Sequence, residues 1–558
     1  MPVKSKWSID IPQVSLPTYL FGSPDGPLPT TPTLISTVKP DTVYLSLHTY
    51  RQWSKRLAAG LQAAGFQPGD RLLLFSGNTL FFPVVIQGAI MAGGIFTGAN
   101  PTYVARELAY QLRDSGAKFL ISAEGSLDTA LEAAKEVGLD QSHIFAFDDG
   151  FATFEGRGKG VGNIKNWTSL LASEAEGERF KWEEATTKEQ LDRTIALNYS
   201  SGTTGVPKGV MITHTNYIAN TAQMAHLGRL TADSEEKEKR TRLLCFLPMY
   251  HAMAQTIFGV GAAKRGIPVY LMPKFDFLDM LACVQKFRIT DLTLVPPVVV
   301  AMSKHPATKQ FDLSSVERVG SGAAPLGRDV CSELEKLWPA GKINVKQGWG
   351  MTEATCSILG WHPDEISESF SVGEPNANCA VKIVDENGKE VAQGERGELW
   401  CTAPNIMKGY WNKPEATKET LTPDGWLKTG DIAYMDKDGK FFIVDRMKEL
   451  IKVKGLQVAP AELEALLLEH PDVADAAVIG VTVNGEEYPR AYIIPQVGSK
   501  PTEQDIHKFM EPRVSRAKRL VGGVRFVDEI PKNPSGKILR KLLREQAKAE
   551  GEAPAAKL

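Results

Sequence analysis

Residues 198–209 are the segment whose residue types point most directly to chemistry. They read NYSSGTTGVPKG and follow a strand-like run at 194–197. Glycines let a backbone bend so that several amide N–H groups converge on phosphate oxygens, while hydroxyls add donors and a lysine adds positive charge. The segment therefore predicts a phosphate-binding loop. Its candidate ligating residues are Ser200, Ser201, Gly202, Thr203, Thr204 and Lys208.

Two alternatives apply to this loop. It is not a Walker loop, because Gly209 follows Lys208 where that motif needs Ser or Thr. A flexible Gly/Ser/Thr linker would share the composition, but the ending Gly-x-Pro-Lys-Gly is atypical of a linker. We therefore favour the phosphate-binding loop.

Two further segments offer a surface for a purine ring. Residues 320–325 (GSGAAP) are small, so a planar ring can lie against their backbone, although a strand-to-helix turn has the same composition. Residues 347–353 (QGWGMTE) follow a predicted strand, where ligand sites of α/β proteins gather. Trp349 offers an aromatic face. The candidate nucleotide contacts are Ala323, Ala324, Gln347, Gly348, Trp349 and Thr352.

Charged and polar residues complete a nucleotide site. Thr352 can bond a phosphate oxygen, and Glu353 is a hard oxygen ligand suited to Mg²⁺, which binds through one or two carboxylates plus phosphates and water. Asp431 can accept hydrogen bonds from both ribose hydroxyls, with Arg446 supporting it; alone, Asp431 would be interpreted as a turn residue after a glycine. Lys537 follows a glycine whose flexibility would let one ammonium group swing into a site. Together these residues predict an ATP site.

Helices and strands must alternate to bring these motifs together. Segments with a helical pattern and segments with a strand pattern follow one another repeatedly along the chain, which indicates parallel sheets covered by helices on both faces. Expected helices are 49–65, 107–114, 127–137, 277–287 and 326–337, and expected strands are 71–75, 118–122, 144–147, 292–295 and 343–347. Residues 80–99 are apolar enough to span a bilayer but contain Pro83 and four glycines, so a buried helix and strand broken at 93–94 is the better interpretation.

The pattern changes after residue 380. Short strands at 381–384, 397–401 and 440–444, separated by turn sequences, predict a small antiparallel unit. Helices at 460–469 and 502–510 and strands at 473–480 and 490–495 predict a further α/β unit. We expect an N-terminal domain at 1–445 and a C-terminal domain at 446–558. The expected fold class is α/β: a large N-terminal body of parallel α/β subdomains with a small β unit, and a small mobile C-terminal α/β domain.

Composition and charge exclude several partner classes. Lys plus Arg number 64 against Asp plus Glu 66, a net charge of −2, so no global field favours nucleic acid or an anionic membrane. Six scattered cysteines without a C-x-x-C pattern favour a reduced compartment with neither a disulfide framework nor a zinc site. No signal peptide or integral membrane segment is expected. Residues 150–162 are expected to form a surface loop, and 234–242 a solvated helix or loop.

The C-terminus carries a candidate targeting signal. Its last three residues, Ala556, Lys557 and Leu558, resemble the peroxisomal address Ser-Lys-Leu with another small residue in the first position. The tail before them is charged and rich in alanine, so we expect it to be exposed. The sequence predicts a peroxisomal location reached through an import receptor. A solvated tail on a cytoplasmic protein is the alternative.

Taken together, the motifs resemble those of the adenylate-forming superfamily, which includes acyl-CoA synthetases, luciferases and peptide-synthetase adenylation domains. They are most similar to its 4-coumarate–CoA ligase-like branch. The matching segments lie in the expected order over nearly the whole chain: 198–209, 247–251, 320–325, 347–353, 425–431, 446–457 and 533–540. The resemblance implies an AMP-forming acid–thiol ligase that uses ATP, Mg²⁺ and CoA. It would convert a small-molecule carboxylic acid first to acyl-AMP and then to a thioester.

The resemblance also implies roles for individual residues. Lys448 matches the hinge about which the small domain rotates, and Lys537 matches the lysine that bridges the carboxylate and the α-phosphate. His251 lies beside the acyl carboxylate in the family, while Lys452 and Gln457 serve catalysis after rotation. The implied catalytic residues are Lys537, His251, Thr352, Glu353, Lys452 and Gln457, and the implied nucleotide contacts include Arg446, Lys448 and Lys452. The implied CoA contacts are Lys274, Lys454 and Gly455. The implied acyl pocket is formed by Tyr250, His251, Met253, Ile257, Gly320 and Gly348.

Two departures from the coumarate ligases narrow the acid. Gly320 stands where those enzymes commonly carry a lysine that contacts the ring hydroxyl, and Met253 stands where tyrosine is common. Methionine makes an apolar, adaptable wall. The sequence therefore favours an apolar acid, either medium-chain aliphatic or arylalkanoic such as phenylacetic acid. The alternatives are a luciferase-like oxygenase, a stand-alone adenylation enzyme that loads a carrier protein, and a nucleotide-binding regulatory protein without turnover.

Overall fold

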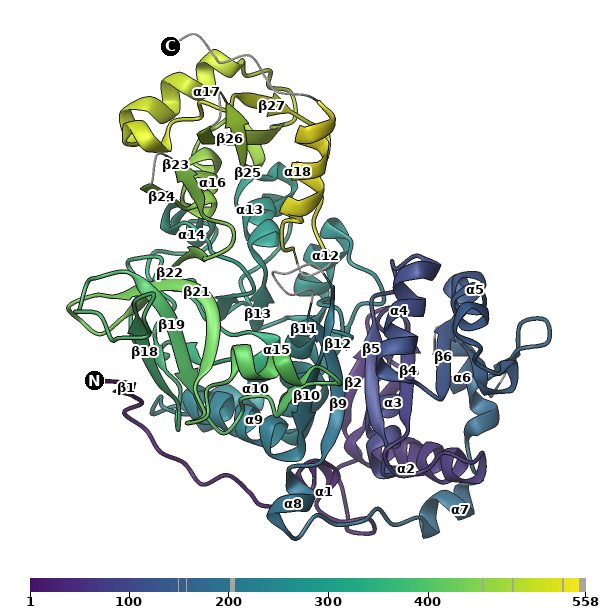
Figure 1. The fold of residues 1–558 in the computed structure, drawn as a ribbon. Helices are drawn as coiled ribbons and strands as arrows, with labels where there is room; N and C mark the ends of the chain where they lie inside the picture. Colours follow the sequence, from purple (N-terminus) through teal and green to yellow (C-terminus); the bar gives the residue numbers. More distant parts are fainter. Residues whose placement is uncertain are drawn as a thin grey trace.

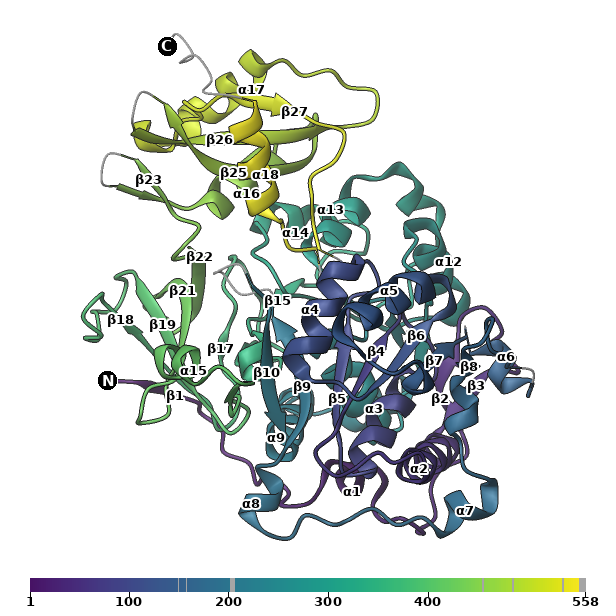
Figure 2. The same ribbon diagram turned by 45° about the vertical axis from the view of Figure 1, so that its right-hand side comes forward.

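The described residues form a larger body, built mainly on three sheets of five or more strands, and a smaller unit beside it. The computed structural model describes residues 1–148, 150–156, 158–200, 206–453, 456–483, 486–533 and 536–550. Two sheets with their helices form most of the larger body, a third sheet lies beside them, and the smaller unit caps the body (Figure 1 and Figure 2). We call the described residues from Met447 onward the smaller unit. The predicted α/β class, with a large N-terminal body and a small C-terminal unit, is confirmed.

An eight-stranded sheet carries the phosphate-loop segment. Its strand order is β20-β10-β9-β5-β4-β6-β7-β8, parallel from β9 to β8 and antiparallel at β10 and β20. Its strands are β4 (Arg71–Phe75), β5 (Ile95–Ala99), β6 (Phe119–Ala123), β7 (Ile144–Phe147), β8 (Lys165–Asn166), β9 (Thr194–Ser200), β10 (Lys208–Thr213) and β20 (Gly409–Tyr410), and its helices include α2 (Leu47–Ala63), α3 (Phe82–Met91), α4 (Ala105–Ser115) and α5 (Leu127–Val137). The parallel centre was predicted; the antiparallel edge was not. Residues 80–99 form α3 and β5 as expected, with the break at Gly93, whose φ of +85° favours glycine.

A seven-stranded sheet carries the two purine-type segments. Its order is β15-β14-β13-β11-β12-β2-β3, and all neighbours are parallel except β2 and β3. Its strands are β2 (Pro32–Ser36), β3 (Tyr44–Ser46), β11 (Leu243–Cys245), β12 (Val269–Leu271), β13 (Asp291–Leu294), β14 (Arg318–Ser321) and β15 (Lys346–Gln347), and the helices between them include α9 (His214–Gly228), α10 (Ser234–Arg240), α11 (Ala252–Ala254), η4 (Gln255–Ala262), α12 (Phe277–Phe287), α13 (Pro296–Lys304) and α14 (Arg328–Glu335). The carboxyl ends of β13, β14 and β15 meet at one edge, where ligands of such sheets bind.

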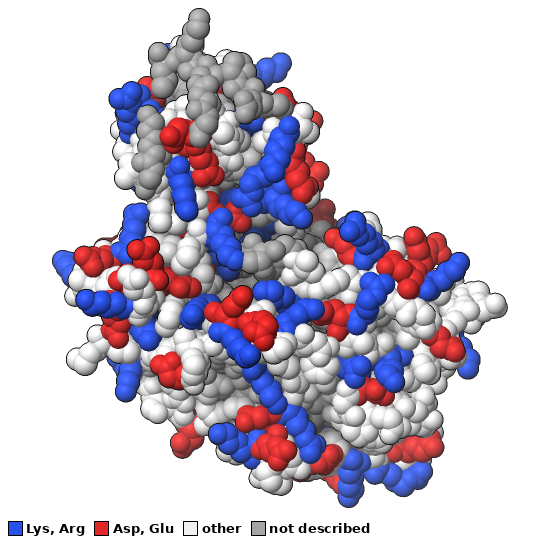
Figure 3. Space-filling model, in the orientation of Figure 1, with Lys and Arg blue, Asp and Glu red and all other residues white. Residues whose placement is uncertain are grey.

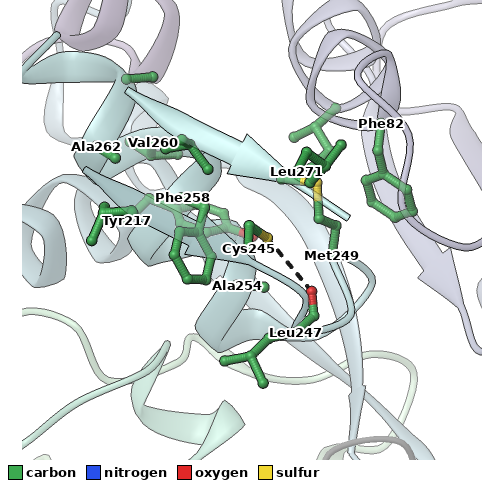
Figure 4. Close-up of a cluster of buried hydrophobic side chains, with 14 of the residues drawn as sticks. Phe82, Tyr217, Cys245, Leu247, Met249, Ala254, Phe258, Val260, Ala262 and Leu271 are labelled. Atoms are coloured by element: carbon green, nitrogen blue, oxygen red, sulfur yellow. Dashed lines mark hydrogen bonds between the residues drawn. The ribbon is translucent and has the colours of Figure 1, made fainter. Parts of the chain in front are cut away.

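One hydrophobic core joins these two sheets. Figure 4 shows Phe258 of η4, Cys245 of β11 and Phe82 of α3 within it, and all three side chains are buried. The Cys245 thiol lies 3.7 Å from the carbonyl oxygen of Leu247, and burial raises its pKa. The core includes Phe246, Leu247 and Met249, which lie in the segment between β11 and His251.

The third sheet is antiparallel, as predicted for the chain after residue 380. Its order is β1-β18-β19-β21-β22, formed by β1 (Val3–Lys4), β18 (Ala380–Val384), β19 (Gly397–Thr402), β21 (Leu427–Met435) and β22 (Phe441–Arg446). The short helix α15 (Pro414–Thr420) precedes β21. In β21 and β22, Asp431 lies opposite Arg446, so the register itself pairs two of the predicted site residues.

The smaller unit has its own strands and helices. They are β23 (Ile451–Val453), β24 (Leu456–Val458), α16 (Pro460–Leu468), β25 (Val473–Val483), β26 (Glu486–Pro495), α17 (Glu503–Met510), β27 (Val524–Phe526) and α18 (Arg540–Ala549). Strands β25 and β26 are antiparallel, and β27 adds to β26 in parallel. Most of its buried apolar side chains pack in two clusters of their own, on either side of β25.

Three local expectations have clear outcomes. The segment 150–162 was predicted as an irregular surface loop, which is wrong in part: Phe151–Phe154 form a helical turn, α6, because Phe154 packs its ring 5.7 Å from that of Phe81 in the core. The charge run at 234–242 forms α10, which buries no side chain. Within the described ranges, no helix combines the length and apolar character that crossing a membrane would need.

Candidate functional site

A cavity of about 170 Å³ lies between the larger body and the smaller unit. Its walls come from the ends of β14 and β15, from β21 and β22, and from α16 and the segment before α18. In the space-filling view, lysine and arginine side chains border the hollow between the two parts (Figure 3). The cavity brings together these predicted site residues: Ala323, Ala324, Gln347, Gly348, Trp349, Asp431, Arg446 and Lys537.

Asp431 is the central carboxylate of this cavity. Its Oδ1 lies 2.6 Å from Nε of Arg446, and its Oδ2 accepts a hydrogen bond of 2.9 Å from Nε1 of Trp349. Burial raises the pKa of Asp431, while Arg446, Trp349 and then Lys537 lower it. Each carboxylate oxygen has a second lone pair, so Asp431 can still accept bonds from a ligand.

Lys537 reaches the same cavity from the smaller unit. Its backbone N–H donates to Oδ1 of Asn533 at 2.8 Å, which closes a tight turn. Gly536 has a φ of +81°, and a methyl group on it would lie 3.0 Å from Cδ of Pro297 in the larger body. A side chain at 536 would therefore push this turn away from the cavity. Burial and the charge of Arg446 lower the pKa of Lys537, whereas Asp431 raises it.

Glu353 connects the phosphate-loop segment to the rest of the site. It lies in the short turn η6 (Thr352–Ala354) and is buried. Its Oε1 accepts hydrogen bonds of 2.9 Å from Oγ of Ser200 and from the hydroxyl of Tyr410. The ammonium group of Lys208 lies 4.9 Å from the centre of the Tyr410 ring. Of the loop, Ser201, Gly202, Thr203 and Thr204 lie outside the described residues.

Tyr410 is a site residue that sequence reasoning missed. It stands on β20, a two-residue strand that pairs with β10, and Val210 lies opposite it. Its hydroxyl pKa is raised, first by burial and then by the charge of Glu353. The only sequence signal was an isolated Gly-Tyr-Trp run, 200 residues after the phosphate loop, and its spacing carries no information about this contact.

A second, small polar cavity of about 30 Å³ adjoins Glu353 through Thr352. Tyr250 and His251 line it together with Asn198. Nδ1 of His251 is buried and has no hydrogen-bond partner among the described residues. Burial, and to a smaller extent the charge of Lys537, lowers the pKa of His251 to about 4. The imidazole ring of His251 is therefore neutral at ordinary pH. The positive charge of Lys537, a residue of the smaller unit, contributes to this by disfavouring protonation.

The predicted acyl-pocket residues Met253, Ile257 and Gly320 belong to the larger body, and none of them lines either cavity. A methyl group on Gly322 would lie 3.9 Å from Sδ of Met253, so the methionine packs over the end of β14. A methyl group on Gly320 would meet only the Lys346 carbonyl oxygen, at 4.0 Å, which leaves open space above it. Ile257 is half-buried in η4 and packs on the core.

Comparison with known proteins places this architecture in a family. Residues 29–411 match the family described as AMP-binding enzyme, and residues 462–537 match the AMP-binding enzyme C-terminal domain. The chain belongs to the AMP-binding enzyme family. The two matches fall on the larger body and on the smaller unit, and together they cover most of the chain.

Curated relatives of this AMP-binding enzyme are CoA ligases. The chain is 39% identical over 506 residues to 4-coumarate–CoA ligase 1 of Narcissus pseudonarcissus, covering 89% of this chain and 88% of that protein. It is 38% identical over 488 residues to peroxisomal OPC-8:0-CoA ligase 1 of Arabidopsis thaliana, covering 86% and 84%. It is 36% identical over 509 residues to a phenylacetyl-CoA ligase of Aspergillus niger, covering 90% and 91%.

A solved structure shows the same fold. The crystal structure of ATP-bound MatB from Rhodopseudomonas palustris superposes with a TM-score of 0.79 at 26% identity, and the match covers 96% of this chain and 99% of that one. The fold class, with a large body and a small C-terminal domain, is thus shared with a protein crystallised with ATP.

Several predicted residues of this AMP-binding enzyme lie away from both cavities. Lys274, Lys448, Lys452 and Gln457 are exposed, and none of them lines either cavity. Lys452 and Gln457 face each other across β23 and β24. Lys454 and Gly455, between those strands, lie outside the described residues, as does the C-terminal tripeptide. In this orientation the structure gathers eight of the predicted nucleotide contacts around the larger cavity, whereas Lys448 and Lys452, also predicted as nucleotide contacts, lie apart from it together with the predicted CoA-step residues Lys274 and Gln457.

The depressed pKa of His251 leads to a pH prediction. An unfolded histidine titrates near 6.5, whereas buried His251 titrates at about 4. Unfolding therefore takes up a proton as pH falls from 6.5 to 4, so native stability falls over that window. Replacing His251 with Phe removes this linkage, and acidification from pH 7 to 5 should then lower the free energy of unfolding by about 2 kcal/mol less than in the wild type.

Urea unfolding of both proteins at the two pH values measures the difference. His214, also held at a pKa of about 4, remains in both proteins as an internal reference; an identical acid dependence would contradict the prediction.

Proposed function

We propose that this protein is an ATP-dependent carboxylate–CoA ligase that activates an apolar carboxylic acid as acyl-AMP and then transfers the acyl group to CoA. The observation that carries the proposal is the convergence of Lys537, Asp431 and Trp349 on one cavity at the ends of β14 and β15. The enzyme class, an AMP-forming acid–thiol ligase, follows from the family and from relatives that are CoA ligases along nearly their whole length. ATP and CoA are accordingly its cosubstrates.

The nucleotide would lie in the larger cavity. We assign Ala323, Ala324 and Trp349 to the adenine ring, because small residues and an aromatic side chain together form a flat apolar slot. Asp431, held by Arg446, accepts the ribose hydroxyls. The phosphates extend toward Ser200, Thr352 and Lys208, which surround Glu353 and Tyr410.

Mg²⁺ is part of the proposal, and Glu353 would hold it. Among the residues that the structure describes, both hydrogen bonds to this carboxylate fall on Oε1, so we assign Oε2 to the cation. Magnesium binds ATP-using sites through one or two carboxylates, with phosphates and water completing its shell, so a single buried carboxylate fits. The ion would neutralise charge on the phosphates.

The first step breaks the bond between the α- and β-phosphates. A carboxylate oxygen of the acid attacks the α-phosphorus, the acyl-AMP anhydride forms, and pyrophosphate leaves. Negative charge builds on the α-phosphoryl oxygens, and the positive charge of Lys537 stabilises it. His251 is neutral, so it shapes the carboxylate site without adding a second cation.

The second step converts the anhydride to a thioester. The CoA thiol loses its proton and its sulfur attacks the acyl carbon, and AMP leaves with the electrons of the broken C–O bond. We propose that rotation of the smaller unit about Lys448 withdraws Lys537 and brings Lys452, Gln457, Lys454 and Gly455 to the site, with Lys274 contacting CoA. The exposure of Lys452 and Gln457 in the present orientation is compatible with this role.

The acid we propose is apolar, either medium-chain aliphatic or arylalkanoic. Met253 is an adaptable thioether wall, and the space above Gly320 is open. The Aspergillus niger relative is a phenylacetyl-CoA ligase, which supports the arylalkanoic option. The test is a screen for acid-dependent AMP release with octanoic, decanoic, phenylacetic and 4-coumaric acids, with and without CoA. AMP release with none of these acids would contradict the proposal, and light emission under O₂ without CoA would favour a luciferase-like oxygenase.

Filling the open space at Gly320 should change the choice of acid. In Gly320→Leu, we expect kcat/KM for phenylacetate and octanoate to fall by about tenfold or more relative to propanoate, because a few misplaced carbons cost this much in an apolar pocket. The KM for ATP should stay within about twofold of wild type. Gly125→Leu, at a turn with open space remote from both cavities, is the matched control. An unchanged preference among the acids would remove Gly320 from the acyl pocket.

We also propose a peroxisomal location. Ala556, Lys557 and Leu558 resemble the receptor-read address, and one of the relatives is a peroxisomal CoA ligase. Location of the fluorescently labelled protein with and without its last three residues tests this; a cytoplasmic signal in both cases would contradict it.

A further inference from the structure

Helix α16 depends on the larger body for its capping groups. Its N-cap position, Ala459, has no side-chain acceptor, and among its described residues none in the last turn is basic. The first N–H and last C=O groups of a helix have no partner within it, so buried helix ends need partners from elsewhere. Figure 1 and Figure 2 show α16 next to α13 and α14, and a methyl group on Gly327, at the start of α14, would lie 3.5 Å from Cβ of Ala465.

The N-terminal end of α16 is capped by Asp445. This residue lies on β22 of the third sheet, and its side chain is buried. Its Oδ2 accepts a hydrogen bond of 2.9 Å from the backbone N–H of Ala461 in the first turn of α16. A carboxylate at this end both satisfies a free donor and complements the helix dipole.

The C-terminal end of α16 is capped by Lys304. This residue ends α13, and its ammonium group donates hydrogen bonds of 2.7 Å to the carbonyl oxygen of Leu468 and 2.5 Å to that of Val473. Leu468 is the last residue of α16 and Val473 the first of β25. A cation at this end complements the helix dipole. Burial lowers the pKa of Lys304, in keeping with an enclosed contact, and Asp475 opposes that shift.

An ion pair between Glu464 and Arg540 connects α16 to the segment that carries Lys537. Glu464, in the middle of α16, accepts two hydrogen bonds, of 2.6 and 2.7 Å, from Nη2 of Arg540. Arg540 begins α18, three residues after Lys537, and its Nε donates to the carbonyl oxygen of Val478. The helix that the larger body caps is thus the helix that anchors the turn bearing Lys537.

We propose that Lys304 and Asp445 are positioning residues that cap α16 from the larger body and so hold the smaller unit in the orientation for acyl-AMP formation. The inference rests on the proposed two-step function. Rotation of the smaller unit for the thioester step carries α16 away from α13 and β22 and breaks both caps. The two contacts therefore stabilise one orientation selectively, and their loss affects one half-reaction.

The test is Lys304→Met, which keeps the length of the side chain but removes its charge and donors. With the acid that gives most AMP in the screen, either phenylacetate or octanoate, pyrophosphate release without CoA should slow by about tenfold, the size of effect expected for losing charged hydrogen bonds. Thioester formation from synthetic acyl-AMP and CoA should stay at or above the wild-type rate.

Amide hydrogen exchange of residues 460–468 should accelerate in Lys304→Met, which is a readout independent of substrate. Lys304→Arg, which retains charge and donors, should restore most of the adenylation rate.

Lys55→Met is the matched control. Lys55 also donates to two backbone carbonyl oxygens, those of Pro24 and Glu178, but entirely within the larger body. It should affect the two half-reactions equally. Equal losses in both half-reactions for Lys304→Met, or wild-type adenylation, would overturn the inference, and Lys304→Gln provides the same comparison if the Met variant fails to fold. Wild-type protein without acid-dependent pyrophosphate release would instead contradict the proposed function.

Discussion

Lys537→Ala should nearly abolish acyl-AMP formation while sparing the second half-reaction. We expect the rate of acid-dependent pyrophosphate release to fall by about 10²- to 10³-fold, as for removal of one preorganised donor at a developing charge. The reason is geometric: Lys537 lines the cavity from the smaller unit, and its charge interacts with those of Asp431 and Arg446. Thioester formation from synthetic acyl-AMP should stay within about twofold of wild type, because the rotation proposed for the second step withdraws Lys537 from the site.

The control for Lys537→Ala is Lys541→Ala. Lys541 lies on α18 four residues further on, is exposed, and forms a long ion pair of 3.9 Å with Glu545. It should leave both half-reactions unchanged. If Lys537→Ala slowed both half-reactions equally, or neither, the placement of Lys537 at the α-phosphate would be wrong.

Lys452→Ala should produce the opposite pattern. Its side chain is exposed in the present orientation and lines neither cavity, so pyrophosphate release should remain within about twofold of wild type. Thioester formation from acyl-AMP should fall by about 10²-fold, the effect of removing a positioned catalytic side chain. The fold should survive, because the backbone N–H of Lys452, which donates to Oε2 of Glu487, is retained.

Lys508→Ala, on the exposed face of α17, serves as the control for Lys452→Ala. Rapid-quench measurement of each half-reaction separates the two effects, since the overall rate reports only the slower step. Similar losses in both half-reactions for Lys452→Ala would contradict the two-orientation account.

Elements with strong periodicity could be predicted from the sequence to within a residue or two. Helices α5 and α12 and strands β4 and β7 have the predicted bounds, because each has a clear apolar face or run bounded by turn residues. Strands of two residues, such as β1 and β20, could not be predicted. Their pairing with β18 and β10 depends on residues far away in the chain, and no local pattern encodes it.

Three residues that line the larger cavity could be named from the sequence, because each motif combines residue types that seldom occur together. Trp349, Asp431 and Lys537 were named from such runs, and they line one cavity. Tyr410 and Lys304 were missed, because each acts through contacts between elements that are remote in sequence. The roles that the resemblance implies for Lys274, Lys452 and Gln457 stay predictions, since this orientation of the smaller unit keeps them apart from the cavities.

In the proposed first step the acid attacks the α-phosphorus of ATP, and the fate of the carboxylate oxygen shows whether it does. The enzyme would be incubated with ATP, CoA and a substrate acid carrying ¹⁸O in both carboxylate positions, and the products analysed by mass spectrometry. We predict one ¹⁸O atom in the phosphate of AMP for each thioester formed, with unlabelled pyrophosphate. Label in inorganic phosphate, formed together with ADP, would mean attack at the γ-phosphorus and would contradict the account.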